Sequence, residues 1–357
     1  MLARGHGPRT IRPVKTVRLT SAKGFLLLDL DDAPASVGLA RSAPSILQSG
    51  AVSMARSVTY SFASFAIEAG GAQLAVNAKP DERPAAIVAA LEQIGPDLEA
   101  GKVLLDLGRG FGPDDLAPVR AGDPRPAWLW EEWRGVSTAD YLVAAGACAA
   151  VAAAGHPVEG HRVAIEGFGL VGLALARLVA DRGGSVVSVG TGAGTVSEPG
   201  GLDVIALGEA WAASGEGLVK SLGPDPRPAW EVFGADADVL FVGSKTGTLT
   251  HEGAEHVQAR AVVPIAPVPF TTKALITLQR AGRTVVPDFL AVAGPHVAGL
   301  GGHADPSAAV EAITTGITEA VMTSAAHPEG LFLGACYRAE DFLRTWQDVL
   351  PFGRPLA

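Results

Sequence analysis

One stretch of the sequence, VAIEGFGLVGLALARLVADRGGSVVSVG, constrains the fold more than any other. Gly167, Gly169 and Gly172 have the spacing G-x-G-x-x-G, directly after a strand-like apolar run and at the start of a helical pattern. In such a turn the first glycine allows a tight bend, the second lets the backbone approach a pyrophosphate, and the third lets the helix pack closely on the strand. The stretch therefore predicts a strand-helix-strand unit that binds a dinucleotide at the helix N-terminus. The residues of the turn predicted to contact it are Gly167, Phe168, Gly169, Leu170, Val171 and Gly172.

The second strand of this unit ends without the acidic residue that usually holds the ribose hydroxyls of NAD. Thr191 stands at that position, within VGTGAGT, and no Arg or Lys lies in this loop to hold a 2′-phosphate. The sequence therefore predicts NAD or NADP as the cofactor and leaves the two open. Gly243 and Ser244, which follow a later strand-like run, join Thr191 as predicted cofactor-binding residues.

Alternating strand-like and helical segments continue around this unit. Apolar runs over 237–243, 260–267 and 283–290 are typical of buried strands, with helical segments between some of them. This alternation indicates a parallel sheet that is covered by helices on both faces.

A separate α/β unit is expected closer to the N-terminus. Residues 24–32 and 101–108 are strand-like, and 43–60 has helical spacing. The predicted fold class is therefore α/β in both parts. We expect an N-terminal α/β substrate and oligomerisation domain over 1–135, a Rossmann-type doubly wound dinucleotide-binding domain over 136–330, and a C-terminal helix over 331–357 that returns to the first domain.

Composition argues against several other classes of protein. Of the 357 residues, 48% are hydrophobic and 18% charged, which is ample apolar material for two packed domains. The net charge of −9 argues against nucleic-acid binding, although a basic arm is expected over 1–23. The longest apolar stretch, 141–155, is too short and alanine-rich to span a membrane. Two separated cysteines, Cys148 and Cys336, and the lack of a visible secretory signal favour a cytoplasmic protein.

Several motifs match a known family in order along the chain. RVAIEGFGLVGLALARLVADRGGSVVSV corresponds to its cofactor motif, ADVLFVGSKTGTLT to its next sheet segment, and VVPDFLAVAG to its V-V-P-D-x-L-A-N-A-G. VTYSFASFAIEAGGAQ corresponds to T-Y-K-N-A followed by G-G-x-K-G-G. On these motifs the chain resembles the glutamate/leucine/phenylalanine/valine dehydrogenase family over about residues 20–325, and in length it is most similar to the leucine and phenylalanine enzymes. The resemblance implies a small-molecule substrate and a homo-oligomer formed mainly through the first domain.

The resemblance also implies a substrate site whose charges have changed. In the family a lysine after T-Y binds the substrate carboxylate, and Ser61 stands at that position. A second lysine, after a glycine pair, activates water, and Gln73 stands there. Asp106, in LDLGR, matches the catalytic aspartate of D-V-G-T, and Val292 matches an asparagine. The predicted catalytic residues are thus Asp106 and Gln73, the predicted substrate-binding residues are Ser61, Gly70, Gly71 and Val292, and no metal site is expected.

The loss of both lysines argues against ordinary dehydrogenation of α-amino acids, because Ser61 cannot neutralise a carboxylate and Gln73 cannot titrate. Hydride transfer itself is carried by the cofactor and needs mainly orientation and a proton, which Asp106 can supply. We therefore expect a diverged NAD(P)-dependent oxidoreductase acting on a C=N or C=O bond of a small molecule that is not anchored by an α-carboxylate. The alternatives are a catalytically degenerate family member that serves as a binding or regulatory scaffold, and a redirected non-redox enzyme.

Other residues near the matched segments are secondary candidates, each with an ordinary structural explanation. Lys245 could replace a lost cation or be exposed, and the spacing of His296 and His303 does not fit a zinc site. Tryptophans can wall a pocket or anchor a domain interface. The remaining candidates are Trp128, Trp130, Trp133, Arg109, Glu68 and Asp140.

Overall fold

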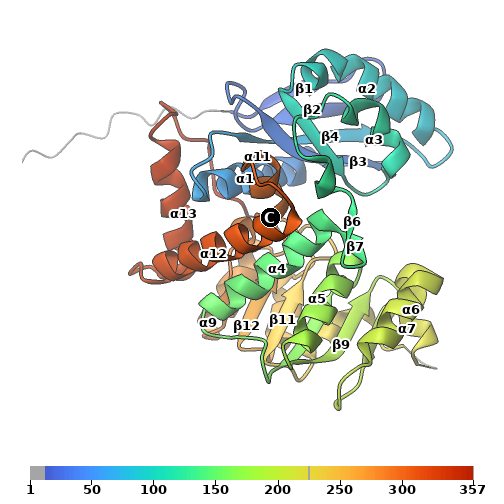
Figure 1. Ribbon diagram of the computed structural model, residues 1–357, viewed down its shortest axis with the longest axis vertical. Helices are drawn as coiled ribbons and strands as arrows, with labels where there is room; N and C mark the ends of the chain where they lie inside the picture. The colour runs from blue at the N-terminus through green and yellow to red at the C-terminus, as the bar shows by residue number, and fades with distance from the viewer. Residues whose placement is uncertain (1–12, 224–225, 357) are drawn as a thin grey trace, which may run out of the picture. The chain divides into compact units, whose positions relative to one another are not determined.

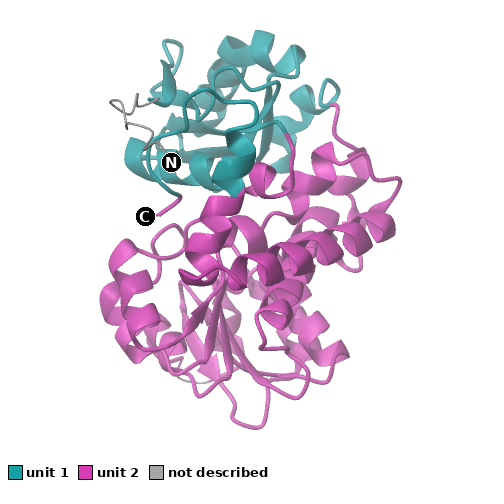
Figure 2. Cartoon of the chain, turned by 90° about the vertical axis from the view of Figure 1, so that its left-hand side faces the viewer, with its two compact units in different colours: residues 1–59, 68–123, 339–354 teal, residues 60–67, 124–338, 355–357 magenta. Residues whose placement is uncertain are grey.

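The computed structural model describes residues 13–223 and 226–356, so most of the basic arm lies outside the described residues (Figure 1). The chain divides into two compact units (Figure 2). The chain passes from one unit to the other between Asp123 and Pro124 and between Arg338 and Ala339. The boundaries expected from the sequence were 135/136 and 330/331. Unit 1 consists of Met1–Thr59, Glu68–Asp123 and Ala339–Arg354, and unit 2 of Tyr60–Ile67, Pro124–Arg338 and Pro355–Ala357.

Unit 1 is built on a sheet whose described strands have the order β1-β2-β4-β3-β5 (Figure 1). β3 is parallel to both β4 and β5, whereas β2 is antiparallel to β4 and β1 to β2. A core that includes Leu26, Leu74 and Leu105 joins one face of the sheet to α2 and α3, and Leu27 packs against α1 on the other face. The strands are β1 (Lys15–Arg18), β2 (Gly24–Leu28), β3 (Ser36–Ala43), β4 (Gly70–Asn77) and β5 (Val103–Leu107), and the helices are α1 (Gln48–Ser64), whose residues from Tyr60 onward are counted with unit 2, α2 (Arg83–Glu99) and α3 (Pro113–Arg120).

The sequence patterns located only part of this sheet. β2 and β5 lie within the two predicted strand-like runs, but β3 and β4 were not predicted as strands, and the helix expected over 43–60 begins instead at Gln48. Nearly every residue of β4 is buried, because helices cover both faces of the sheet. A strand buried on both faces lacks the alternation of apolar and polar residues by which an exposed strand is recognised.

Unit 2 contains a second sheet of described strands in the order β10-β9-β8-β11-β12-β13, parallel except for β10. α4 packs against both α5 and α12. The predicted α/β class with a Rossmann-type second part is confirmed. The principal elements are α4 (Thr138–Ala153), β8 (Arg162–Glu166), α5 (Leu170–Asp181), β9 (Ser185–Thr191), β10 (Gly194–Ser197), α6 (Val204–Ser214), β11 (Val239–Val242), β12 (Ala261–Pro264), α9 (Thr272–Arg280), β13 (Thr284–Val285) and α12 (Pro306–Ala325).

Short elements complete the described fold. The strand expected over 283–290 ends at Val285, because Pro287 has no N–H for a ladder and its φ of −65° starts α10 instead. α13 ends at Leu343, so the last residues of the segment expected as a C-terminal helix are not helical. The remaining elements are η1 (Ala127–Leu129), β6 (Glu132–Trp133), β7 (Val136–Ser137), η2 (Gly215–Gly217), α7 (Leu218–Ser221), η3 (Ala229–Gly234), α8 (His251–His256), α10 (Asp288–Ala291), α11 (Gly294–Leu300) and α13 (Gly330–Leu343).

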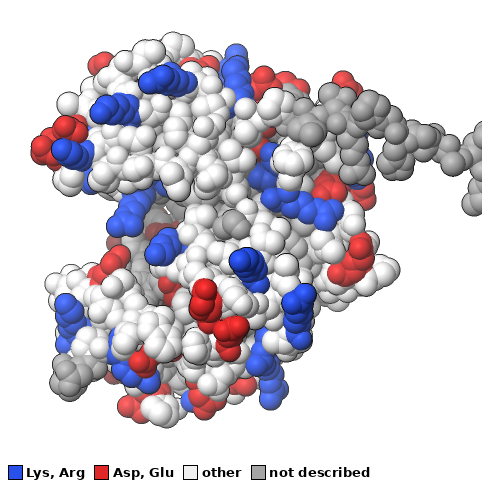
Figure 3. All heavy atoms as spheres, turned by 180° about the vertical axis from the view of Figure 1, so that it is seen from behind, with Lys and Arg blue, Asp and Glu red and all other residues white. Residues whose placement is uncertain are grey.

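The surface carries charged side chains of both signs, and both cysteines lie in the interior. Basic and acidic side chains are interspersed over the face drawn in Figure 3. None of the helices described is both long and apolar enough to cross a membrane. Cys148 and Cys336 are buried and neither is part of a disulfide, and burial raises the pKa of the Cys148 thiol to about 12. The Cys148 thiol is therefore protonated and unreactive at neutral pH.

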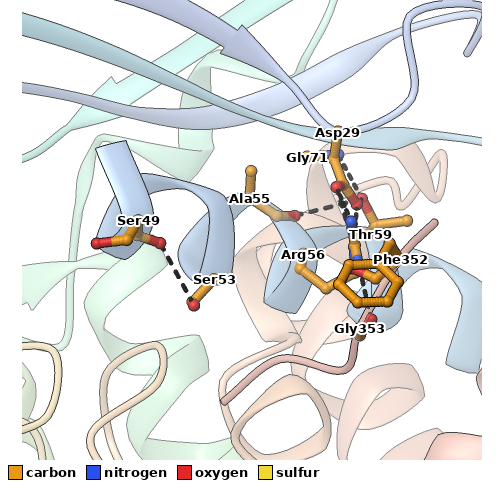
Figure 4. A network of polar contacts seen from close by, with 9 residues as sticks. All are labelled: Asp29, Ser49, Ser53, Ala55, Arg56, Thr59, Gly71, Phe352 and Gly353. Carbon is orange, nitrogen blue, oxygen red and sulfur yellow. Dashed lines mark hydrogen bonds and ion pairs between the residues drawn. The ribbon is translucent and has the colours of Figure 1, made fainter. Parts of the chain in front are cut away.

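A buried ion pair joins three segments of unit 1 (Figure 4). Arg56 of α1 donates to both carboxylate oxygens of Asp29, which follows β2, with an Nη2–Oδ1 distance of 2.7 Å and side-chain exposures of 3% and 0%. The same guanidinium donates to the backbone carbonyls of Phe352 and Gly353. The pair therefore links α1, the end of β2 and the C-terminal segment of unit 1.

We predict that Arg56→Met destabilises unit 1 by about 3–5 kcal/mol, because it leaves the Asp29 carboxylate buried without its cation. Denaturant unfolding, followed by far-ultraviolet circular dichroism, would measure the loss in the free energy of unfolding. The control is Arg344→Met, which removes an exposed pair with Asp341 and a longer contact with Glu340, a carboxylate that keeps its pair with Arg354, and it should cost about 1 kcal/mol or less. Equal losses in the two variants would show that burial of the Arg56 pair has no special weight, and the double variant Asp29→Leu/Arg56→Met should recover part of the stability.

Candidate functional site

The glycine turn of unit 2 has the geometry that its sequence predicted. Gly167 has φ of +82°, and a Cβ placed on it would lie 2.4 Å from the backbone nitrogen of Ser244. The backbone N–H groups of Gly167 and Phe168 donate to the carbonyl of Gly190, which ties the turn to β9. Gly169 begins α5 without a side-chain cap. The start of α5 therefore presents backbone N–H groups and the positive end of the helix dipole, which suits a phosphate.

Glu166, at the end of β8, lies within the candidate site and was missed by the sequence analysis. Its side chain is buried, and Oε2 accepts hydrogen bonds from the backbone nitrogens of Gly243 (3.0 Å) and Ser244 (3.1 Å). Oε1 accepts from the Thr248 hydroxyl at 3.1 Å. This carboxylate holds the loop after β11 beside the glycine turn, so the predicted cofactor-binding residues of the two loops lie together. The only signal in the sequence was a single acid at the end of an otherwise apolar strand.

Thr191 is buried at the end of β9 and has a structural role. Its hydroxyl donates to the backbone carbonyl of Glu216 at 2.7 Å and accepts from the backbone nitrogen of Ala193 at 3.1 Å. The Glu216 carboxylate lies over the following turn, where Oε2 is 2.9 Å from the position of a Cβ on Gly192. The sequence has no acidic residue at position 191, but the fold brings the Glu216 carboxylate of η2 next to that position.

In unit 1, Gln73 and Asp106 lie on one face of the sheet. Leu39 of β3 is in register with Gln73 of β4 on one side and with Asp106 of β5 on the other. Residues in register point to the same face, so both side chains are on the face that α1 partly covers. Gln73 is fully buried, and neither its amide nitrogen nor its amide oxygen has a hydrogen-bond partner within the described residues. Asp106 is 19% exposed and lies 3.9 Å from Nη2 of Arg120.

The glycine pair before Gln73 is fixed by close packing and by the buried ion pair. A Cβ on Gly71 would lie 1.8 Å from the backbone oxygen of Ala55 in α1, so only glycine fits there. The Thr59 hydroxyl accepts from the backbone nitrogen of Gly71 at 2.9 Å and donates to Asp29 at 2.6 Å (Figure 4). Thr59, from the T-Y motif, thereby fixes the distance between β4 and α1.

Ser61 and Val292 belong to unit 2, and both are buried. The Ser61 hydroxyl has no partner among the described residues. Tyr60 packs edge-on against Phe289 with ring centroids 5.4 Å apart, which brings the end of α1 to the helix that precedes Val292. Nearby, the buried Asp288 carboxylate accepts from the backbone nitrogen of Val268 and holds it at φ of +51°.

The secondary candidates have mostly structural surroundings. Asp140 accepts from the Ser137 hydroxyl at the start of α4, and burial raises its pKa while that hydrogen bond lowers it. Trp133 packs on Tyr141, and Arg125 lies over Trp130. His296 belongs to α11 and packs against Phe62. Lys245, Arg109 and Glu68 are exposed, while His303 and Trp128 are half-buried.

Arg41 is a third residue, after Glu166 and Glu216, that the sequence analysis missed. It lies on β3 two residues after Leu39, and its Nε and Nη2 atoms are buried without a partner in the described part of the chain. Desolvation by burial lowers the pKa of its guanidinium. No group of three or more described His, Cys, Asp or Glu side chains is placed to hold a metal ion.

Part of this chain is similar in sequence to known dehydrogenases. Residues 135–299 match the family described as glutamate/leucine/phenylalanine/valine dehydrogenase. An NAD-specific glutamate dehydrogenase of Staphylococcus aureus is 33% identical over 137 residues, which cover 38% of this chain and 33% of that protein. Glutamate dehydrogenase A2 of Halobacterium salinarum is 34% identical over 132 residues, covering 37% and 32%. The match thus spans about a third of the length of these relatives.

Solved structures extend the likeness to nearly the whole chain. The hetero-hexameric glutamate dehydrogenase of Thermus thermophilus, in its leucine-bound form, has a TM-score of 0.78 at 23% identity and covers 96% of this chain and 91% of its own. L-tryptophan dehydrogenase of Nostoc punctiforme has a TM-score of 0.60 at 18% identity, covering 94% and 97%. The chain is thus similar to the glutamate/leucine/phenylalanine/valine dehydrogenase family in sequence over residues 135–299, and it shares the fold of these dehydrogenases over both units.

Proposed function

We propose that the protein is an NAD(P)-dependent oxidoreductase that transfers hydride to or from a C=N or C=O bond of a small molecule that is not anchored by an α-carboxylate. The observation that carries this proposal is the glycine turn at Gly167, which Glu166 joins to the loop of Gly243 and Ser244. Similarity to NAD-specific glutamate dehydrogenases over the same segment supports it.

The side chains of unit 1 suit reduction of a double bond that is already formed. A bound nicotinamide would supply or accept the hydride, since hydride transfer is the chemistry that this cofactor carries in oxidoreductases. Asp106 would give a proton to the nitrogen or oxygen of the substrate, so that an imine becomes an amine and a ketone an alcohol. The buried Gln73 amide would hydrogen-bond the substrate, but it cannot remove a proton from water.

Glu216 supports a preference for NAD within this proposal. Its carboxylate lies at the turn after β9, where a dinucleotide presents the hydroxyls of the adenosine ribose. A carboxylate there accepts hydrogen bonds from those hydroxyls and repels a 2′-phosphate. We also propose a homo-oligomer, and the hetero-hexameric assembly of the similar Thermus thermophilus protein supports it.

A catalytically degenerate scaffold is the second candidate function. Ser61 and Gln73 in place of two family lysines favour it, since both positions have lost a charge. Both candidates share nucleotide binding, so oxidation of NADH or NADPH by a panel of cyclic imines and ketones is the measurement that separates them. If the protein binds nucleotide but turns over none of these imines and ketones, the scaffold becomes the better proposal.

The glycine turn gives a prediction for cofactor binding. Gly167→Ala should raise the dissociation constant for NADH at least about tenfold, because a Cβ would collide with Ser244 and the positive φ would be strained. Fluorescence titration of NADH measures this. Gly200→Ala is the control, since a Cβ there meets only ordinary contacts at a permitted φ. Unchanged affinity in the Gly167 variant would place the nucleotide elsewhere or nowhere.

A second prediction concerns cofactor choice. The protein should bind NADH at least about tenfold more tightly than NADPH, a difference of about 1.4 kcal/mol, and Glu216→Gln should bring the two affinities together. The same titration measures both ratios. Glu209→Gln removes an exposed acid from α6 and should leave the preference intact. A preference for NADPH in the unaltered protein would contradict the role given to Glu216.

A third prediction tests the proton donor. Asp106→Asn should lower kcat for imine or ketone reduction by about 10²–10⁴-fold and leave NADH affinity unchanged, because the amide cannot release a proton. Stopped-flow decay of NADH absorbance measures the step. The exposed Asp81→Asn serves as the control. Full turnover in the Asp106 variant would remove this residue from the mechanism.

A further inference from the structure

α6 of unit 2 runs antiparallel to α5, so its C-terminal end lies beside the glycine turn. A Cβ on Gly208 of α6 would lie 3.5 Å from Cδ1 of Leu173, in the first turn of α5. Trp211, one turn later in α6, packs edge-on against Phe168, two residues before α5, with ring centroids 6.4 Å apart. Higher residue numbers in α6 thus meet lower numbers in and before α5. The fold therefore brings Trp211 to the end of α5 that suits a phosphate.

The Trp211 indole borders the space that Gly169 leaves open. A Cβ placed on Gly169 would lie 3.7 Å from Cη2 of Trp211 and 4.0 Å from the backbone oxygen of Gly167. In this motif the second glycine has no Cβ, and that is what lets a pyrophosphate approach the backbone. A ligand atom that takes the position of the missing Cβ would therefore be in van der Waals contact with the indole.

The surface on this side of the glycine turn is apolar. Leu170, the first residue of α5, is 45% exposed, and Trp211 is half-buried. Phe168, which supports the indole edge-on, is 2% exposed. An apolar wall keeps water from one side of a bound anion, and the attraction between the anion and the helix N-terminus is stronger where water is excluded. The wall therefore favours a phosphate at the turn without making a hydrogen bond to it.

The chain after α6 returns to the same edge of the sheet with a second side chain. The helix ends where the backbone N–H of Gly215, at φ of +54°, donates to the carbonyl of Trp211. Glu216 follows directly, and its carbonyl accepts from the Thr191 hydroxyl. Its carboxylate lies at the turn of Gly192. The segment 211–216 thus places an aromatic ring beside the glycine turn and a carboxylate beside the end of β9.

We propose that Trp211 is a cofactor-binding residue, whose indole forms the wall beside Gly169 against which the pyrophosphate and the adjoining adenosine ribose pack. The inference rests on the proposed function and deepens it, since Trp211 and Glu216 would bind the adenosine half of the dinucleotide from one segment of the chain. A tryptophan has only two side-chain torsions, so it gives a large contact area at a low cost in conformational entropy.

ADP-ribose tests the contact without hydride transfer, because it contains the pyrophosphate and the adenosine but no nicotinamide. Trp211→Leu should raise the dissociation constants of ADP-ribose and NADH at least about tenfold, whereas Trp211→Phe keeps an aromatic ring and should raise them about threefold or less. Isothermal titration calorimetry measures both ligands. Trp230→Leu is the matched control and should leave both affinities unchanged, since Trp230 of unit 2 is 53% exposed and packs on His256.

Tryptophan emission is a readout that a purely structural role of Trp211 would not move. ADP-ribose has no nicotinamide to accept excitation energy from distant tryptophans, so it reports on an indole that it contacts. The change in emission on adding ADP-ribose should occur in the unaltered protein and in Trp230→Phe, and it should be lost in Trp211→Phe. Trp211→Phe retains a ring against Phe168, so its Tm without ligand should fall by no more than about 4 °C.

The outcomes separate this inference from the proposed function. If NADH binds and imines are reduced, but Trp211→Leu binds ADP-ribose as tightly as the unaltered protein or Trp211→Phe keeps the emission change, the role of Trp211 is wrong while the oxidoreductase stands. If both effects appear and no imine or ketone is reduced, Trp211 binds nucleotide in the scaffold of the second candidate function. If the unaltered protein binds neither ADP-ribose nor NADH, both proposals are overturned.

Discussion

The contact between Gly71 and Ala55 is the constraint on which the substrate face of unit 1 depends. Backbone meets backbone there, because a Cβ on Gly71 would lie 1.8 Å from a carbonyl oxygen. Such closeness needs a fixed distance between α1 and β4, and Asp29 provides it by joining Arg56 and Thr59 of α1 to the strand end. The carboxylate accepts hydrogen bonds from three donor atoms, Nε and Nη2 of Arg56 and the Thr59 hydroxyl, so its burial is compensated. Gln73, two residues after Gly71, takes its place on the sheet from this arrangement.

A buried carboxylate has a comparable position in unit 2. Glu166 accepts from the backbone nitrogens of Gly243 and Ser244, so these two N–H groups are already used. A phosphate at this edge of the sheet would then have to be held by the glycine turn and the start of α5, rather than by the loop after β11. Among the predicted cofactor-binding residues, Gly243 and Ser244 would therefore shape the loop beside the glycine turn rather than donate hydrogen bonds to a ligand.

The sequence predicted what depends on local pattern. The turn at Gly167 was visible because strand, glycine spacing and helix follow one another directly in the chain. Arg41, Glu216 and Glu166 were not found, because their importance depends on which strand or loop lies beside them. Arg41 gains its meaning only from the register that sets β3 between Gln73 and Asp106. Glu216 comes 25 residues after Thr191 and meets it only through the hydrogen bond between them. Family motifs located Gln73 and Asp106, but they could not show that the Gln73 amide has no partner in the described structure.

Glutamine at position 73 and arginine at position 41 limit which reactions this face supports. A lysine in a buried site can lose its proton and act as a base, whereas arginine stays protonated and glutamine does not titrate. Among Gln73, Arg41 and Asp106, only the last has a side chain that can both take up and release a proton. Oxidative deamination needs a base to activate water in addition to a proton carrier for nitrogen, and one carboxyl group cannot be in both protonation states at once. Reduction of an existing double bond needs a single proton donor. The side chains of this face therefore favour reduction of an imine or ketone over deamination of an amine.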